Sequence, residues 1–181
     1  MRELHVIEFL SLDGVMEEPE SWQRPYFDDV LGSTTAEGMA STDAYLFGRR
    51  TYEKMAAYWP TAPTDDPYGR HLNSTPKYVA STTLTDPEWE HTEVLPGAVA
   101  EEVARLKARD GGNIAVLGSG ELVQTLIRHD LVDQWFLGLF PLLLGRGKRL
   151  FGELSGVRKL QLADSKPTTT GGVLLTYRRA S

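Results

Sequence analysis

The sequence predicts an α/β domain built around one mixed β-sheet, spanning residues 1–181. Three observations favour this fold class. Short apolar runs rich in β-branched and aromatic residues alternate with helical patterns up to about residue 130, only extended segments follow, and no repeat or linker divides the chain. The alternation predicts a mostly parallel sheet covered by helices on both faces. The final segments are joined by turns too short for helical crossovers, so they should pair antiparallel at one edge.

The first half of the chain is expected to supply four strands and two helices. Leu4–Leu10 is dense in β-branched and aromatic residues and stops at Asp13-Gly14, which is typical of a buried strand. A polar loop, Glu17–Pro25, follows it. The other elements expected here are helices over Tyr26–Ser41 and Arg49–Tyr58, strands over Asp43–Gly48, Lys77–Ser81 and Thr92–Leu95, and a loop rich in Pro, Asp and Gly over Pro60–Asn73.

The second half is expected to supply two helices and four extended segments. Ala98–Arg109 carries Val99, Val103 and Leu106 on one stripe, and Ser119–His129 carries a similar apolar face, so both are interpreted as helices. The extended segments are Ile114–Leu117, Leu131–Phe140, 158–165 and 172–179, with Gly171-Gly172 as a turn signal before the last.

Composition excludes several classes of protein. Leu, Ile, Val and Phe make up about a quarter of the chain, above the roughly 20% below which chains stay disordered. The chain has no cysteine, which excludes a disulfide scaffold, a thiolate metal site and a cysteine nucleophile. Its longest apolar run, Trp135 to Leu144, is far shorter than the roughly 20 residues of a membrane span, and the N-terminus lacks a signal-peptide pattern. We expect a cytoplasmic protein with no membrane contact.

Charge is distributed unevenly along the chain. The formal net charge of −6 disfavours a nucleic-acid partner. Residues 1–140 carry 11 Lys/Arg against 23 Asp/Glu, whereas residues 141–181 carry 8 against 2. Solvated surface would account for this pattern. Two other interpretations stay open: acidic and basic faces that meet in an oligomer, or a phosphorylated ligand held by Arg146, Lys148 and Arg149.

A homodimer is expected from the apolar segments near the C-terminus. The run from Leu137 to Leu144 exceeds what one strand face needs, and Val173–Leu175 leaves an apolar segment in the strand expected to end the sheet. Burial against a second copy would cover both, and a two-fold dimer is the commonest oligomer. The alternative is a strand covered on both faces within one subunit.

Two strand-to-helix junctions carry the candidate binding residues. At Gly48-Arg49-Arg50-Thr51 an apolar strand meets a helix start, where unpaired N–H groups, the helix dipole and arginines suit a phosphate. The alternative is that Thr51 only caps the helix and both arginines are solvated. At Leu117-Gly118-Ser119-Gly120-Glu121-Leu122 glycines again follow a buried strand, although Val123 stands where G-x-G-x-x-G needs its third glycine. This junction is either a tight turn or the second half of one dinucleotide site, because ligands bind at the carboxyl ends of parallel strands.

Other chemistry has weak support. His5, His71, His91 and His129 lack metal-ligand spacing, so no metal is expected. No G-x-S-x-G motif is present to place a serine nucleophile. Asp13, Asp28 and Asp29 are possible proton carriers, with a capping or solvated role as the alternative. Trp22 would help to wall a pocket for a planar ligand, or pack in the core.

At these residues the sequence resembles the dihydrofolate reductase-like superfamily, and in particular the reductase domain of the bifunctional deaminase-reductase of riboflavin biosynthesis. Four motifs occur in the expected order and span residues 11 to 151. They are Ser11–Gly14, Leu46–Glu53, Leu117–Leu122, and Pro141–Gly147 with Leu150-Phe151. The resemblance implies a three-layer α/β/α fold with a mixed, mostly parallel sheet and antiparallel C-terminal strands.

The resemblance also implies NADPH as the cofactor and assigns residues to its site. Cofactor contacts are implied for Gly48, Arg49, Arg50, Thr51, Ser81, Thr82, Leu117, Gly118, Ser119, Gly120, Glu121 and Leu122. Substrate contacts are implied for Ile7, Phe9, Ser11, Asp13 and Trp22. Because a 2′-phosphate needs cationic partners, we expect Arg49, Arg50 and Lys77 to favour NADPH over NADH.

The expected activity is hydride transfer from NADPH to a small pteridine- or pyrimidine-type heterocycle. Dihydrofolate reductases carry an acid on the first helix, where this chain has Gly32, and a tyrosine where it has Val123. The substrate therefore stays open between the two heterocycle classes. The alternative function is a catalytically inactive nucleotide-binding or sensing protein on the same fold.

Overall fold

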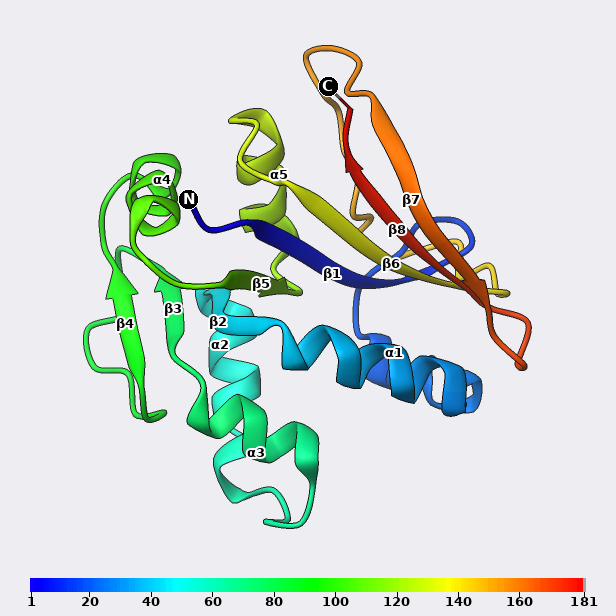
Figure 1. Cartoon of the computed structure of the whole chain (residues 1–181), viewed down its shortest axis with the longest axis horizontal. Coiled ribbons are helices and arrows are strands. Elements are labelled where there is room, and N and C mark those ends of the chain that lie inside the picture. Colours follow the sequence, from blue (N-terminus) through cyan, green and yellow to red (C-terminus); the bar gives the residue numbers. More distant parts are fainter. Residues whose placement is uncertain (181) are drawn as a thin grey trace.

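An eight-stranded sheet runs through the part of the chain that the structure describes, residues 1–180 of a computed structural model (Figure 1). The strand order is β4-β3-β2-β5-β1-β6-β8-β7. The strands β1 to β6 run parallel, β8 pairs antiparallel with β6, and β7 pairs antiparallel with β8. Their bounds are Leu4–Ser11 (β1), Thr42–Gly48 (β2), Lys77–Ala80 (β3), Thr92–Leu95 (β4), Asn113–Leu117 (β5), Gln134–Phe140 (β6), Leu160–Pro167 (β7) and Val173–Arg179 (β8).

Helices cover the sheet on both faces. Helices α4 and α5 lie on one face and α1, α2 and α3 on the other, so the molecule has three layers (Figure 1). The helices are α1 (Asp29–Ala40), α2 (Arg49–Ala56), α3 (Pro67–Ser74), α4 (Val99–Ala108) and α5 (Gly120–Arg128). The expected three-layer fold with antiparallel C-terminal strands is therefore confirmed.

The central strand β1 divides its side chains between the two faces. Leu4, Val6 and Leu10 are buried in the core under α4 and α5, whereas Ile7 and Phe9 pack on the opposite face. Successive side chains of a strand point to opposite faces, and both faces of this sheet are covered, so the strand carries apolar residues on both faces. Burying each such side chain contributes about 1.5–3 kcal/mol relative to leaving it exposed.

The expected loop over Pro60–Asn73 is wrong in its second half, because helix α3 occupies Pro67–Ser74. The Asp66 carboxylate caps this helix by accepting hydrogen bonds from the backbone N–H of Tyr68 at 2.9 Å and of Gly69 at 3.4 Å. Proline suits the first position of a helix, where its missing N–H leaves no bond unmade. The Asp-Pro pair was thus a helix-start signal that the surrounding prolines and glycine obscured.

The first helix begins later than expected. A single 3₁₀ turn holds Arg24–Tyr26, and α1 starts at Asp29 because the carboxylate of Asp28 accepts a hydrogen bond from the backbone N–H of Leu31 at 2.9 Å. Aspartate is among the preferred residues at this capping position.

The outermost strand is β7, not the final strand β8. Because β8 pairs with β6 on one side and β7 on the other, Val173–Leu175 is not an open edge, which corrects the expectation from the sequence. Every residue of β7 except Lys166 is exposed.

Among residues 1–180, no helix combines the length and apolar character that crossing a membrane requires.

Candidate cofactor site

The strand connections change direction between β1 and β5. The chain leaving β1 passes through α1 on one face to reach β2, whereas the chain leaving β5 passes through α5 on the other face to reach β6. Connections that leave neighbouring strands in opposite directions create a crevice at the carboxyl ends of those strands, and such crevices are where α/β sheets bind ligands.

The two glycine-containing junctions meet beside this crevice. The backbone N–H of Gly48, at the end of β2, donates a hydrogen bond of 2.8 Å to the Ser119 hydroxyl, which follows β5. A side chain at Gly48 would lie 3.3 Å from the Ser119 side chain, so glycine permits this close approach. The structure therefore brings together Gly48, Arg49, Arg50 and Thr51 with Gly118, Ser119, Gly120 and Glu121, as one dinucleotide site would require.

Neither of these two helix starts is capped by the side chain of its N-cap residue. Without such a capping bond, the first N–H groups of a helix have no intrahelical partner. The N-cap residues are Gly48 for α2 and Ser119 for α5, and neither forms a side-chain capping bond in the described part of the chain. Thr51 is therefore not the cap of α2, which removes the alternative role considered for it. Its side chain packs at the Gly118 turn, where an added Cβ would lie 3.1 Å from Thr51 Cγ2. Open N–H groups beside a glycine turn with close backbone approach fit a pyrophosphate.

The two arginines of the first junction differ in their partners. Arg49 donates to the Glu53 carboxylate at 2.7 Å and to the Thr83 hydroxyl at 2.6 Å, which ties α2 to the loop after β3. Arg50 is largely exposed and lies 3.9 Å from the Glu121 carboxylate. Ser81, in the same loop, accepts from the backbone N–H of Leu84 at 3.0 Å. Arg49 and Ser81 thus gather beyond the carboxyl end of β3, and Thr82 is the exposed residue between Ser81 and Thr83.

The expected role of Lys77 is wrong. Lys77 opens β3, so it lies at the opposite end of the sheet from Gly48, whose neighbour on β3 is Ala80. Its ammonium group is fully buried and donates to the carbonyl oxygens of Leu72 and Thr75, each at 2.8 Å. Burial lowers the pKa of Lys77 to about 8. The residue holds α3 to the sheet and cannot reach a cofactor phosphate.

Asp13 connects the Ser11–Val15 turn to the loop after β6. One carboxylate oxygen accepts from the Ser11 hydroxyl at 2.6 Å and from the Leu144 N–H at 3.1 Å, and the other accepts from the Gly145 N–H at 2.8 Å. These bonds lower the pKa of Asp13 to about 2, with the Ser11 hydroxyl as the largest cause. Asp13 is therefore ionised at neutral pH and anchors this loop.

The acid sensitivity of this anchor is testable. Because the folded-state pKa of Asp13 lies below its ordinary value of 3.8, its stabilising contribution is complete above about pH 4 and is lost as the pH falls toward 2. We expect Asp13→Asn to lower the melting temperature at pH 5 to 8, and the difference from the wild type to shrink below pH 4. A difference in melting temperature that stays constant from pH 7 to pH 2 would contradict this role.

The other two aspartates behave differently. Asp28 caps α1 with one oxygen, and its other oxygen accepts from the Thr169 backbone N–H at 2.6 Å and hydroxyl at 2.8 Å. The pKa of its carboxyl is lowered, mainly by the Leu31 N–H. Asp28 is thus a structural acceptor that joins α1 to the β7–β8 turn. Asp29 lies exposed in the first turn of α1, and its carboxylate makes no contact with the crevice among the described residues.

An aromatic wall forms on the α1 face of β1 and β6. The ring of Phe140 lies 5.7 Å from that of Phe9 and 6.1 Å from that of Trp22, in edge-to-face arrangements. Two of the expected substrate residues therefore share one cluster. Ile7 packs on the same face but in the neighbouring cluster with Leu117, and the Ser11 hydroxyl is buried in the turn described above. The face between Phe9 and α1 is the side of the crevice suited to a flat ring.

Sequence patterns did not indicate two residues that the structure places here. Thr83 contacts Arg49, and Glu8 is buried in β1 beside the crevice. The one visible signal was the acidic residue Glu8 inside a mostly apolar strand. Arg149, which the sequence suggested as a partner of a phosphorylated ligand, lies 3.5 Å from the Asp13 carboxylate.

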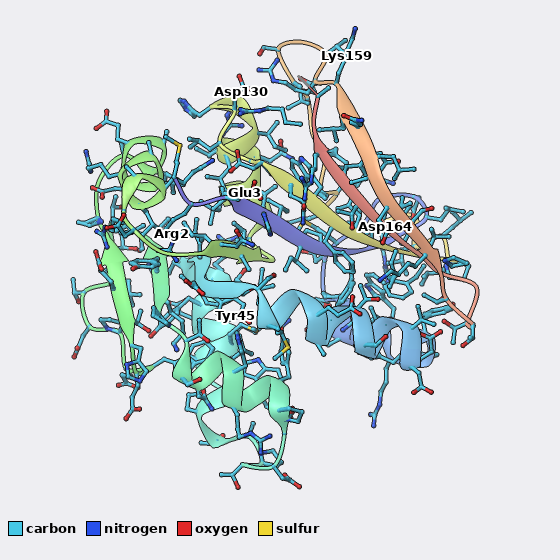
Figure 2. All side chains as sticks on the ribbon, in the orientation of Figure 1. Arg2, Glu3, Tyr45, Asp130, Lys159 and Asp164 are labelled. Carbon is cyan, nitrogen blue, oxygen red and sulfur yellow. The ribbon has the colours of Figure 1, made fainter. Side chains whose placement is uncertain are left out.

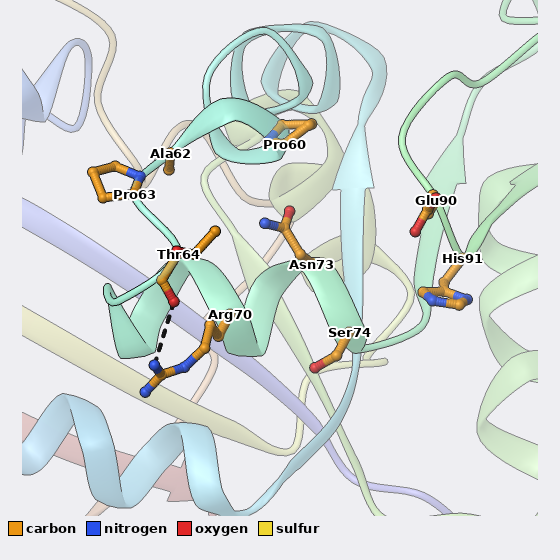
Figure 3. Close-up of a pocket in the computed structure, with 9 residues that line it drawn as sticks. All are labelled: Pro60, Ala62, Pro63, Thr64, Arg70, Asn73, Ser74, Glu90 and His91. Carbon is orange, nitrogen blue, oxygen red and sulfur yellow. Dashed lines mark hydrogen bonds between the residues drawn. The ribbon is translucent and has the colours of Figure 1, made fainter.

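A separate hollow lies away from the two glycine junctions. It is bounded by the 60–64 segment, α3 and the start of β4, where Arg70 donates to the Thr64 carbonyl at 3.3 Å (Figure 3). His91 on its rim immediately precedes β4, which pairs with the start of β3 at Lys77 and Thr92. The hollow is therefore at the amino ends of the strands, opposite to the glycine turns.

This architecture defines the dihydrofolate reductase-like class of α/β fold. The structure of dihydrofolate reductase from Enterococcus faecalis, complexed with NADP(H) and RAB-propyl, matches 99% of this chain and 97% of its own with a TM-score of 0.66 at 16% identity. A putative riboflavin biosynthesis protein from Shewanella sp. PV-4 matches 99% of both chains with a TM-score of 0.76 at 24% identity.

A third solved structure relates the chain to a two-part enzyme. The diaminohydroxyphosphoribosylaminopyrimidine deaminase/5-amino-6-(5-phosphoribosylamino)uracil reductase from Thermotoga maritima matches with a TM-score of 0.71 at 16% identity. The match covers 99% of this chain and 57% of that protein. The RibD C-terminal domain family matches residues 3–174. The chain belongs to the RibD C-terminal domain family, which together with the fold supports a reductase-type function.

Proposed function

We propose that this chain is an NADPH-dependent reductase that transfers a hydride to a small pteridine- or pyrimidine-type heterocycle. The observation that carries the proposal is the Gly48–Ser119 hydrogen bond, because it unites both phosphate-type junctions at the β1–β5 crevice. Membership of the RibD C-terminal domain family and the reductase titles of the Thermotoga and Enterococcus structures support the same activity.

The chain's own residues would bind and orient the reactants. The N–H groups at the starts of α2 and α5 would hold the pyrophosphate, with Thr51 and Gly118 shaping the turn. Arg49 and Arg50, with Ser81 and Thr82 nearby, would contact the 2′-phosphate. The bound cofactor supplies the hydride, and the protein's contribution is orientation and electrostatics.

The heterocycle would lie against the aromatic wall. Phe9 and Trp22 are half-buried, so part of each aromatic ring stays exposed and could contact a flat ligand. Stacked or edge-to-face aromatic contacts contribute about 0.5–1.5 kcal/mol beyond the area they bury.

Turnover separates this proposal from the alternative of an inactive nucleotide-binding or sensing protein. We expect NADPH to bind, and its near-ultraviolet absorbance to fall when a dihydropteridine or a ribosylaminopyrimidine is added. Tight binding of NADPH without oxidation across the whole panel would favour the sensing function. Failure of NADPH to bind would overturn both.

We further propose that the chain is a homodimer that covers the β7 side of the sheet. Leu162 is 50% exposed and Leu160 is 38% exposed on the edge strand. Leu162 pairs with Tyr177 of β8, which pairs with Trp135 of β6, so an apolar surface continues from the core onto the edge. Lys159, which precedes β7, and Asp164, which lies within it, are found along this edge of the molecule (Figure 2).

Light scattering at micromolar concentration tests the dimer. We expect twice the chain mass for the wild type, and the mass of one chain for Leu162→Lys, because a charge on a buried interface is costly without a partner. Lys159→Glu, at the end of the strand, is the control for surface charge. A wild type with the mass of one chain would contradict the proposal.

A further inference from the structure

Glu8 occupies the position in β1 where the crevice opens. The last residue pair between β1 and β5 is Ile7 with Leu117, so Glu8 lies beside the turn that begins at Gly118. On its other side Glu8 pairs with Leu137 of β6, which is buried. Glu8 is therefore paired with β6 on one side and lies next to the glycine turn of the candidate cofactor site on the other.

One buried oxygen of the Glu8 side chain is unsatisfied. The residue is 5% exposed, and its Oε1 atom has no hydrogen-bond partner among residues 1–180. Its neighbours on the same strand face, Val6 and Leu10, are buried and apolar. Burial raises the pKa of Glu8 well above its ordinary value, which favours the neutral form of the carboxyl group.

An unpartnered buried acid is costly for a folded protein. Buried polar groups are almost always hydrogen-bonded, and exceptions call for a specific explanation such as a ligand or a catalytic role. A methionine or leucine at this position would fill the same space without an unsatisfied oxygen. The position beside the crevice supplies the explanation, because a ligand bound there could complete the hydrogen bonds of the carboxyl.

We propose that the buried carboxyl group of Glu8 binds the carboxamide of the nicotinamide ring. In its neutral form a carboxyl group is complementary to a primary carboxamide: the acid O–H donates to the amide oxygen, and the acid carbonyl accepts from the amide N–H. This assignment rests on the proposed function and deepens it, since it identifies the group in β1 that orients the reactive ring. Met16 packs in the same core cluster as Val6 and Leu10, and its Sδ lies 3.0 Å from where a Cβ on Gly120 would be.

The experiment compares two ligands that differ in the presence of the nicotinamide group. Dissociation constants of NADPH and of 2′-phospho-ADP-ribose, which lacks nicotinamide, are measured by calorimetry for the wild type, Glu8→Met and Glu8→Gln. We expect Glu8→Met to weaken NADPH about tenfold and to leave 2′-phospho-ADP-ribose unchanged, because two neutral hydrogen bonds are lost. Glu8→Gln keeps a donor and an acceptor, so it should stay within about threefold of the wild type for both ligands.

Controls distinguish this role from a structural one. Val6→Ala changes a buried residue on the same strand and face, away from the crevice, and should lower the melting temperature without discriminating between the ligands. Equal weakening of both ligands by Glu8→Met would assign Glu8 a structural role, and wild-type affinity of Glu8→Met for NADPH would place it outside the site. Either result overturns the inference. If the wild type itself does not bind NADPH, the proposed function fails instead.

Discussion

Replacing Arg49 and Arg50 together with alanine is expected to weaken NADPH binding by about 10- to 100-fold and to change the affinity for NADH by less than about threefold. The 2′-phosphate is the group that distinguishes the two cofactors, and each charge-assisted contact to it is worth about 1.5–3 kcal/mol. Each contact is expected to contribute about 1.5 kcal/mol, the lower end of this energy range, because both guanidinium groups are exposed and screened by salt.

The matched control removes the same charge elsewhere. Arg105 on α4 and Arg128 at the C-terminal end of α5 lie outside both junctions and pair locally with their own helices. Replacing both with alanine should leave both dissociation constants unchanged. Equal losses for NADPH and NADH in the Arg49/Arg50 variant would refute a 2′-phosphate role, and measurements at two salt concentrations would show whether the loss is electrostatic.

Replacing Gly118 with valine is expected to have the second large effect, on both stability and binding. Gly118 has a φ of +59°, which is unfavourable for a β-branched residue, and its new Cβ would lie 3.1 Å from Thr51 Cγ2. We expect the free energy of unfolding to fall by about 2–3 kcal/mol. Displacement of the turn would separate Ser119 from Gly48, so NADPH and NADH should both lose at least about tenfold in affinity.

Gly38→Ala is the control for a glycine replacement. Gly38 lies within α1, and no atom lies within 4 Å of the position that its Cβ would take. We expect this variant to gain about 0.4–1 kcal/mol of stability and to bind both cofactors as the wild type does. Thermal unfolding and calorimetry measure both variants. A Gly118→Val protein with wild-type affinity would show that the turn is not part of the cofactor site.

The fold was predictable from the sequence because its strongest signals are local. Apolar strands that end in glycine, followed by amphipathic helices, marked β1, β2, β5 and α5 to within a few residues. The prediction was least accurate for helix boundaries that are set by side-chain capping bonds. The Asp28 and Asp66 carboxylates decide where α1 and α3 begin, and such bonds compete with proline- and glycine-rich neighbours in a way that periodicity does not reveal.

The site was only partly predictable, because its geometry depends on contacts between distant segments. The sequence pointed to both glycine junctions, but the Gly48–Ser119 bond that joins them spans 71 positions. The assignment of Lys77 was wrong because this residue opens β3 and therefore lies at the amino ends of the parallel strands, opposite to the glycine junctions. The bonds from Asp13 to the loop after β6, and the pairing of Glu8 with Leu137 of β6, also join segments that are distant in the sequence.

A crystal of the protein soaked with NADPH tests the dinucleotide site most directly. We expect electron density for the pyrophosphate against Gly118–Gly120 and the start of α2, and for the nicotinamide ring in the crevice between β1 and β5. Density in the hollow beside Arg70 and His91, or no density at millimolar NADPH, would contradict the assignment of this site.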